Sequence, residues 1–162
     1  MLSCMGDSAH DSQHIYRVLF IALDIAEHEK NVDKDILIAA CLLHDIGRKE
    51  QFEDPSLCHA QVGAEKARTF LLENGFDSEF ADRVAACVRK HRYRSASPPE
   101  KMEEKILFDS DKLEAAGLMG IARSLLYEGK AGTPIYSLGS DFEVLDGAGN
   151  EPPSFLENIT LN

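Results

Sequence analysis

The residues of this sequence most suited to chemistry are His44 and Asp45, which directly follow an unbroken apolar run at positions 36–43. Such a run is too long for one amphipathic face and too short to cross a bilayer, so it predicts a helix buried on most sides. Asp33 is placed to cap the start of this helix, and Gly47 is placed to end it. Asp45 then falls in the last turn, where free carbonyl groups already carry negative character, so its carboxylate needs a cation. The pair is therefore a candidate metal site, with imidazole nitrogen and carboxylate oxygen as ligands.

Other residues of ligand type each fall at the start or on the inward face of a separate predicted helix. They are His14, His59, His91 and Asp111. Taken singly, each has an ordinary structural explanation, such as a solvated first-turn residue for His14 or a satisfied core histidine for His91. Taken together they indicate a site, because helix bundles build metal centres from side chains that several helices point inward. Histidine with aspartate favours Mn, Fe, Mg or a similar ion over the zinc of thiolate sites.

The spacing of apolar residues predicts the helices that carry these side chains. The expected helices are about 8–31, the buried helix between Asp33 and Gly47, 59–74, 78–92, 98–116 and 118–127. A polar connection containing Asp54-Pro55 follows the buried helix, and a capping-box pattern at Ser97 starts the fifth. No series of strands is indicated before residue 129, so the predicted class is all-α. We expect a helical domain over 1–128 and an irregular tail over 129–162, with a short hairpin, packed on the same domain.

Composition and charge exclude several classes of protein. The net charge is −11, and the isoelectric point of about 4.9 opposes broad binding to a polyanion, so long nucleic acid is not an expected partner. The first residues contain no signal peptide or anchor, and mean hydropathy is −0.23, which predicts a cytoplasmic protein without a membrane partner. The four cysteines show no CxxC spacing and are expected as free thiols, two of them buried. Homo-oligomerisation is left open.

The order and context of the candidate ligands over residues 10–123 resemble the HD-domain phosphohydrolase superfamily, an all-helical group named for its His…His-Asp…Asp metal site. The resemblance implies metal ligands at His14 in HIYRV, at His44 and Asp45 in LLHDIGR, and at Asp111 in FDSDKLEAAG. It implies two further active-site histidines, His59 in HAQVGAEKA and His91 in VRKHRYR, and a phosphate-contacting lysine at Lys112. The chain departs from the family pattern at Asp11-Ser12, where an aromatic residue is expected, and at Glu114, where Asp is expected.

The resemblance implies a metal-dependent phosphohydrolase that acts on a small phosphate ester or anhydride, most of all a nucleotide. One divalent ion per chain is expected (Mn, Fe, Mg, Ni or Co), with a second possible through His59 and His91. Asp45 would bind the ion and orient the attacking water, and His59 or His91 would donate a proton to the leaving oxygen. Arg17, Arg48 and Lys112 would hold phosphate oxygens.

Two other functions are compatible with the same ligands. A di-iron oxygenase can use this helical scaffold, and a non-enzymatic binding module stabilised by metal would keep the ligands and hydrolyse nothing. The sequence does not separate one bound ion from two.

Overall fold

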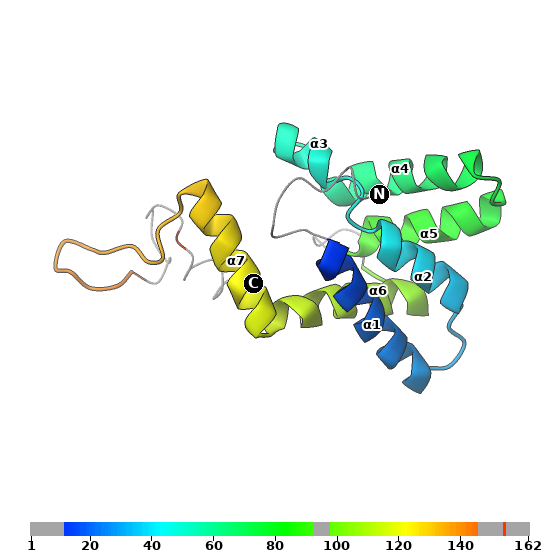
Figure 1. Cartoon of the computed structure of the whole chain (residues 1–162), viewed down its shortest axis with the longest axis horizontal. Helices are drawn as coiled ribbons and strands as arrows, with labels where there is room; N and C mark the ends of the chain where they lie inside the picture. The colour runs from blue at the N-terminus through cyan, green and yellow to red at the C-terminus, as the bar shows by residue number, and fades with distance from the viewer. Residues whose placement is uncertain (1–11, 93–97, 146–153, 155–162) are drawn as a thin grey trace. The chain divides into compact units, whose positions relative to one another are not determined.

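The computed structural model describes residues 12–92, 98–145 and 154, and these residues form an all-α protein, as the sequence predicts. The helices are α1 (Ser12–His28), α2 (Lys34–Leu43), α3 (Arg48–Glu53), α4 (His59–Glu73), α5 (Ser78–Lys90), α6 (Met102–Ala116) and α7 (Leu118–Ala131) (Figure 1). Within the described ranges the only β-type pairing is an isolated antiparallel bridge between Leu138 and Val144. No described helix is long and apolar enough to cross a membrane.

The observed helices differ from the predicted ones at α3, at the end of α7 and at the start of α6, which begins at Met102 and not at 98. The polar connection after α2 contains the short helix α3, which the sequence pattern does not indicate because none of its residues is buried. Helix α7 continues past its predicted end at Tyr127 to Ala131 and is capped by Gly132 in the left-handed conformation. The predicted capping residue Ser97 and the start of the first predicted helix before Ser12 lie outside the described residues.

The chain divides into two compact units, residues 1–116 and 117–162. In the first unit, α4 and α5 lie side by side, α2 packs against α1, α5 and α6, and α1 packs along α6. In the second unit, α7 is followed by the segment that carries the Leu138–Val144 bridge. The assignment of residues 1–128 to one domain and 129–162 to its tail stays a prediction.

The core of the first unit surrounds α2. Leu37, Ala40 and Cys41 of this helix are completely buried, as the apolar run predicts. Burial raises the pKa of the Cys41 and Cys87 thiols to about 12, so both are neutral and unreactive. They are free thiols, in agreement with the cysteine spacing. The start of α2 is capped as expected, because the Asp33 side chain accepts a hydrogen bond from the Ile36 amide.

Gly47 has a different role from the predicted one. It does not end α2 in a left-handed conformation; its φ is −92° and it precedes α3. A Cβ at this position would collide with the His59 carbonyl oxygen and would lie 2.6 Å from the Gly63 nitrogen. Gly63, which the sequence suggests has a close neighbour, faces Gly47 across this contact. The two glycines therefore let the turn after α2 approach the backbone of α4.

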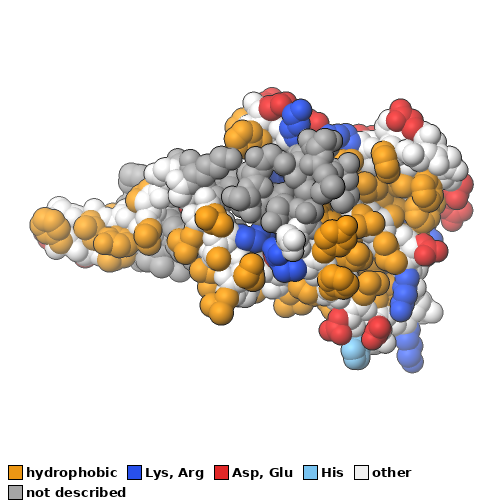
Figure 2. All heavy atoms as spheres, viewed as in Figure 1, with side chains coloured by type: hydrophobic (Ala, Val, Ile, Leu, Met, Phe, Trp, Pro, Cys, Tyr) orange, Lys and Arg blue, Asp and Glu red, His pale blue; other side chains and the backbone are white. Residues whose placement is uncertain are grey.

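Large apolar side chains also occur on the surface of the first unit. Phe20 and Tyr16 on α1 are 67% and 50% exposed. Figure 2 shows hydrophobic side chains gathered over the part of the visible face where α1 and α2 lie in Figure 1. These side chains lie outside the core and contribute no group to the site described next.

Candidate metal centre

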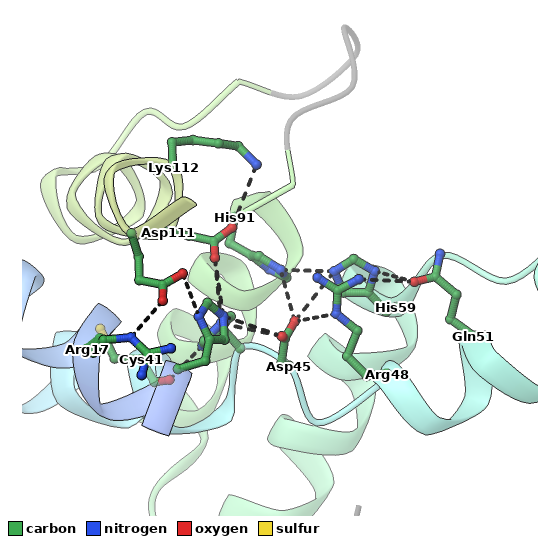
Figure 3. Close-up of polar contacts among 12 residues, drawn as sticks. Arg17, Cys41, Asp45, Arg48, Gln51, His59, His91, Asp111 and Lys112 are labelled. Carbon is green, nitrogen blue, oxygen red and sulfur yellow. Dashed lines mark hydrogen bonds and ion pairs between the residues drawn. The ribbon is translucent and has the colours of Figure 1, made fainter. Parts of the chain in front are cut away.

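All six residues of ligand type converge at the carboxyl end of α2, and Figure 3 labels Asp45, His59, His91 and Asp111 among them. His14 comes from α1, His59 from the start of α4 and Asp111 from α6. His44 and Asp45 follow α2, and His91 directly follows α5. The four histidines and Asp45 are buried, and the Asp111 side chain is 15% exposed. His44, His59 and His91 each lie where a helix ends or begins.

The first cluster consists of His14, His44, Asp45 and Asp111. The Nε2 atoms of His14 and His44 lie 3.7 and 3.8 Å from Oδ2 of Asp45 and 3.3 Å from one another. Oδ1 of Asp111 lies 3.5 Å from Nε2 of His14 and 4.0 Å from Nε2 of His44. The ligand atoms of His14, His44 and Asp45 therefore lie close enough together to hold one ion, and Asp111 lies beside both histidines.

The second cluster uses the other oxygen of the same aspartate. Oδ1 of Asp45 lies 3.7 Å from Nε2 of His59 and 3.8 Å from Nε2 of His91. These two nitrogens are 3.1 Å apart. Asp45 therefore stands between two histidine pairs and presents one carboxylate oxygen to each.

Backbone carbonyl groups orient two of the histidines. Nδ1 of His44 lies 2.7 Å from the Cys41 carbonyl oxygen, and Nδ1 of His91 lies 2.6 Å from the Val88 carbonyl oxygen. A carbonyl can only accept, so both Nδ1 atoms carry the proton. Each Nε2 then presents a lone pair to the centre of the site.

The side chain of Gln51 orients His59. Its Oε1 lies 2.8 Å from Nδ1 of His59 and 3.4 Å from Nη1 of Arg48, and because arginine only donates, this atom is the amide oxygen. Nδ1 of His59 therefore donates to Gln51. Nη1 of Arg92 lies 3.2 Å from the same Nδ1, but this contact is not a hydrogen bond, since both atoms are then donors.

A carboxylate orients the fourth histidine. Nδ1 of His14 lies 3.1 Å from Oε2 of Glu114, an ion-pair contact whose geometry is not that of a hydrogen bond. His44, His59 and His91 consequently present Nε2 lone pairs inward, and the lone pairs of His59 and His91 cannot hydrogen bond to each other. Pairs 3.3 and 3.1 Å apart match neighbouring ligands of one metal ion, which lie about 3 Å apart at metal–nitrogen distances of about 2.1 Å. The donor set therefore fits a divalent cation.

Burial and neighbouring charges keep these donors ready for a metal. The pKa of His59 falls to about 2, because burial disfavours the imidazolium and Arg48 adds positive charge beside it. The pKa of His91 falls to about 4 through burial and the nearby His44. Burial would raise the pKa of Asp111, but His44 and His91 outweigh it and hold that pKa below its usual value. Neutral imidazoles and ionised carboxylates are the forms that bind metal ions.

The three predicted phosphate-binding cations lie around these clusters, each beside a carboxylate. Nε of Arg48 lies 2.8 Å from Oδ1 of Asp45, and Nζ of Lys112 lies 3.7 Å from Oδ2 of Asp111. Lys112 also lies over the ring of Phe108, 5.6 Å from its centre. Nε of Arg17 lies 2.8 Å from Oε1 of Glu114, the carboxylate that contacts His14.

Sequence reasoning missed Gln51 and the contacts of Arg92 and Glu114. Gln51 belongs to α3, which has no apolar pattern to reveal it. Arg92 directly follows His91, where the sequence offers only a basic stretch. Glu114 had a usable signal, because a residue three positions after Asp111 on a helix lies on the same face.

Comparison with known proteins gives a family match and several relatives. The HD domain family model matches residues 11–116. The uncharacterized protein YpgQ of Bacillus subtilis is 32% identical over 133 residues, which are 80% of this chain and 62% of that protein. YpgQ has been solved in complex with ADP, and that structure superposes with a TM-score of 0.61 over 80% of this chain and 65% of the other.

Two further solved structures are similar. A predicted HD superfamily hydrolase from an uncultured Thermotogales bacterium is 40% identical with a TM-score of 0.63, over 76% of this chain and 67% of that one. A Lactobacillus plantarum protein is 20% identical with a TM-score of 0.72, over 98% of this chain and 74% of the other, and indicates the fold alone. The present chain spans less than two thirds of the length of YpgQ.

Proposed function

Because this chain belongs to the HD domain family and brings together His and Asp groups able to hold a metal ion, we propose that it is a metal-dependent phosphohydrolase. Its proposed substrate is a small phosphate ester or anhydride, in the first place a nucleotide. The observation that carries the proposal is the arrangement of four inward Nε2 atoms around one shared aspartate. We place the protein in the cytoplasm, where the free thiols of Cys41 and Cys87 would stay reduced.

HD domains bind divalent metal ions, and His14, His44, Asp45 and Asp111 would hold the first ion, for which we propose manganese. A bound divalent ion neutralises phosphate charge and lowers the pKa of a bound water, so that hydroxide is available near neutral pH. The chain itself fixes the ligand directions, through acceptors at Nδ1 of His44, His59 and His91 and through the Glu114 carboxylate beside Nδ1 of His14. Asp45 would bind the ion through one oxygen, and its other oxygen, which faces His59 and His91, would orient the water.

The position of the ring protons of His59 and His91 helps to decide whether these residues are metal ligands or general acids. A proton donor needs its N–H directed at the substrate, but the proton of each ring lies on Nδ1 and is donated to Gln51 or to the Val88 carbonyl. The Nε2 atoms contact Asp45 as closely as those of the first cluster do. This supports His59 and His91 as ligands of a second ion more than as general acids.

Positively charged side chains near the two clusters support the proposal that the substrate carries a phosphate group. Arg48 and Lys112 border the Asp45 and Asp111 carboxylates, and phosphate oxygens brought to the site would meet both positive groups. Arg17 has its Nε directed at Glu114, so its terminal nitrogens are the atoms proposed to contact phosphate. The ADP bound in a structure of YpgQ supports a nucleotide as the substrate class. The net charge of −11 disfavours long nucleic acid.

The test is a substrate panel on protein with measured metal content. Nucleoside mono-, di- and triphosphates, cyclic nucleotides and an aryl phosphate are assayed with Mn, Fe, Mg, Ni and Co, with and without oxygen. We expect metal-dependent phosphate release that Asp45→Ala abolishes and that His28→Ala, which removes an exposed histidine of α1, leaves unchanged.

Three outcomes contradict the proposal in different ways. Oxygen consumption by the iron-loaded protein without phosphate release indicates the di-iron oxygenase. Retained metal with no turnover of any compound indicates a binding module. Protein that takes up none of these metals refutes the metal site itself.

A further inference from the structure

We propose that Glu114 is a positioning residue that fixes the proposed metal ligand His14 and the proposed phosphate contact Arg17 in one rigid unit. The inference rests on the proposed function, since it gives His14 the role of a ligand. Nothing in the family resemblance assigns this role to Glu114, a position where the sequence departs from the expected Asp.

The two oxygens of the Glu114 carboxylate have different partners. Oε1 accepts a hydrogen bond of 2.8 Å from Nε of Arg17, and Oε2 lies 3.1 Å from Nδ1 of His14. The Glu114 side chain is 2% exposed and that of Arg17 is 30% exposed. His14 and Arg17 lie one turn apart on α1, whereas Glu114 lies on α6, so one carboxylate joins two helices at the site.

The contact with His14 differs in kind from those of the other three histidines. His44 and His91 donate Nδ1–H to carbonyl groups of their own helical turns, and His59 donates to the neutral amide of Gln51. A carboxylate is a stronger acceptor, and it increases the basicity of the opposite ring nitrogen as a metal ligand. His14 is therefore the histidine whose metal affinity depends on a buried charge.

Arg17 compensates the buried negative charge of Glu114. A buried carboxylate without a cation is costly, and Arg17 supplies one from the more exposed side of the pair. Because its Nε is fixed on Glu114, the guanidinium is held at a set orientation relative to His14. The Glu114 carboxylate thus holds the proposed metal ligand His14 and the proposed phosphate contact Arg17 at a fixed distance from one another.

Glu114→Gln is the sharpest test, because glutamine has the same size but a single acceptor atom. In this variant the amide oxygen of the glutamine would accept from the Arg17 cation. The amide NH₂ group would then face Nδ1 of His14. That ring must then move its proton to Nε2, where the proton blocks metal binding. We expect the dissociation constant for Mn²⁺, measured by calorimetry, to rise 10- to 100-fold, the usual effect of losing such an orienting carboxylate.

Glu103→Gln is the matched control. Glu103 is a buried glutamate of the same helix that also pairs with an arginine, Arg83, and its other contact is the Asp33 amide, which belongs to no candidate ligand. This variant should bind Mn²⁺ within about twofold of wild type. Glu114→Asp, which keeps the charge, should recover part of the affinity that Glu114→Gln loses. Thermal unfolding of each metal-free variant shows whether the comparison is made on folded protein.

A second readout needs neither metal nor turnover. Nitrogen NMR of the metal-free protein reports the tautomer of each histidine, and we expect the Nδ1–H form for His14 in wild type and the Nε2–H form in Glu114→Gln. An unchanged tautomer, or a Glu114→Gln affinity equal to that of the Glu103→Gln control, would overturn the inference. Wild-type protein that binds Mn²⁺ but hydrolyses nothing would instead refute the proposed function and leave the positioning role standing.

Discussion

The stability of the metal-free protein should fall steeply between pH 7 and pH 5, because His59 and His91 are buried as neutral rings. Their pKa values in the folded protein are about 2 and about 4, whereas an unfolded histidine titrates near 6.5. In this pH interval the unfolded chain takes up protons at both residues and the folded chain takes up almost none. Stability is therefore fully present above pH 6.5 and is lost as the pH falls toward the folded-state values.

The size of the effect follows from the same values. For a ring that stays neutral in the folded state, going from pH 7 to pH 5 costs about 2 kcal/mol of unfolding free energy, so the two rings together cost about 4 kcal/mol. Domains of this kind are stable by about 5–15 kcal/mol, so the loss is easily measured. The lowered pKa of Asp111 acts only below about pH 4 and does not contribute here.

The measurement is urea unfolding of chelator-treated protein at several pH values, followed by circular dichroism. The matched variant is His59→Asn/His91→Asn, in which neither position can titrate, and its stability should change much less over the same interval. A wild-type loss below about 1 kcal/mol, or an equal loss in the double variant, would refute the neutral-ring reasoning.

Three further predictions concern the metal ions and the backbone around them. Asp45→Ala should reduce metal content to near zero by elemental analysis, because both clusters use its carboxylate; retention of one full ion would contradict the shared position. His59→Ala and His91→Ala should each lower the content from about two ions to one and reduce turnover with it, whereas unchanged content with turnover lowered by about 10² to 10⁴ would indicate general acid catalysis instead. Gly47→Ala should destabilise the protein by about 1–3 kcal/mol in chemical unfolding, because the methyl group meets the backbone of α4; Gly129→Ala, where a Cβ meets nothing within 4 Å, is the control and should be neutral or stabilising.

Local patterns in the sequence determined most of the fold. The apolar spacing on α1, α4 and α5 and the unbroken run of α2 predicted the all-α class, since helical periodicity depends on neighbours within a few positions. Asp33 was predicted as a cap on the same local grounds, and its hydrogen bond to Ile36 confirms it. The same patterns identified six residues of ligand type, because imidazole and carboxylate groups on inward helix faces are uncommon without a reason.

Tertiary structure decided how those residues are used. The position of Asp45 between two histidine pairs depends on where α1, α4, α5 and α6 meet, and no periodicity along the chain encodes this. Arg17 and Glu114 are 97 positions apart, so their ion pair leaves no local signal. The short helix α3 and the close contact of Gly47 with Gly63 depend in the same way on packing between segments. A sequence pattern reports which face of a helix is buried, but the partner on the other side of that face is chosen only when the helices pack.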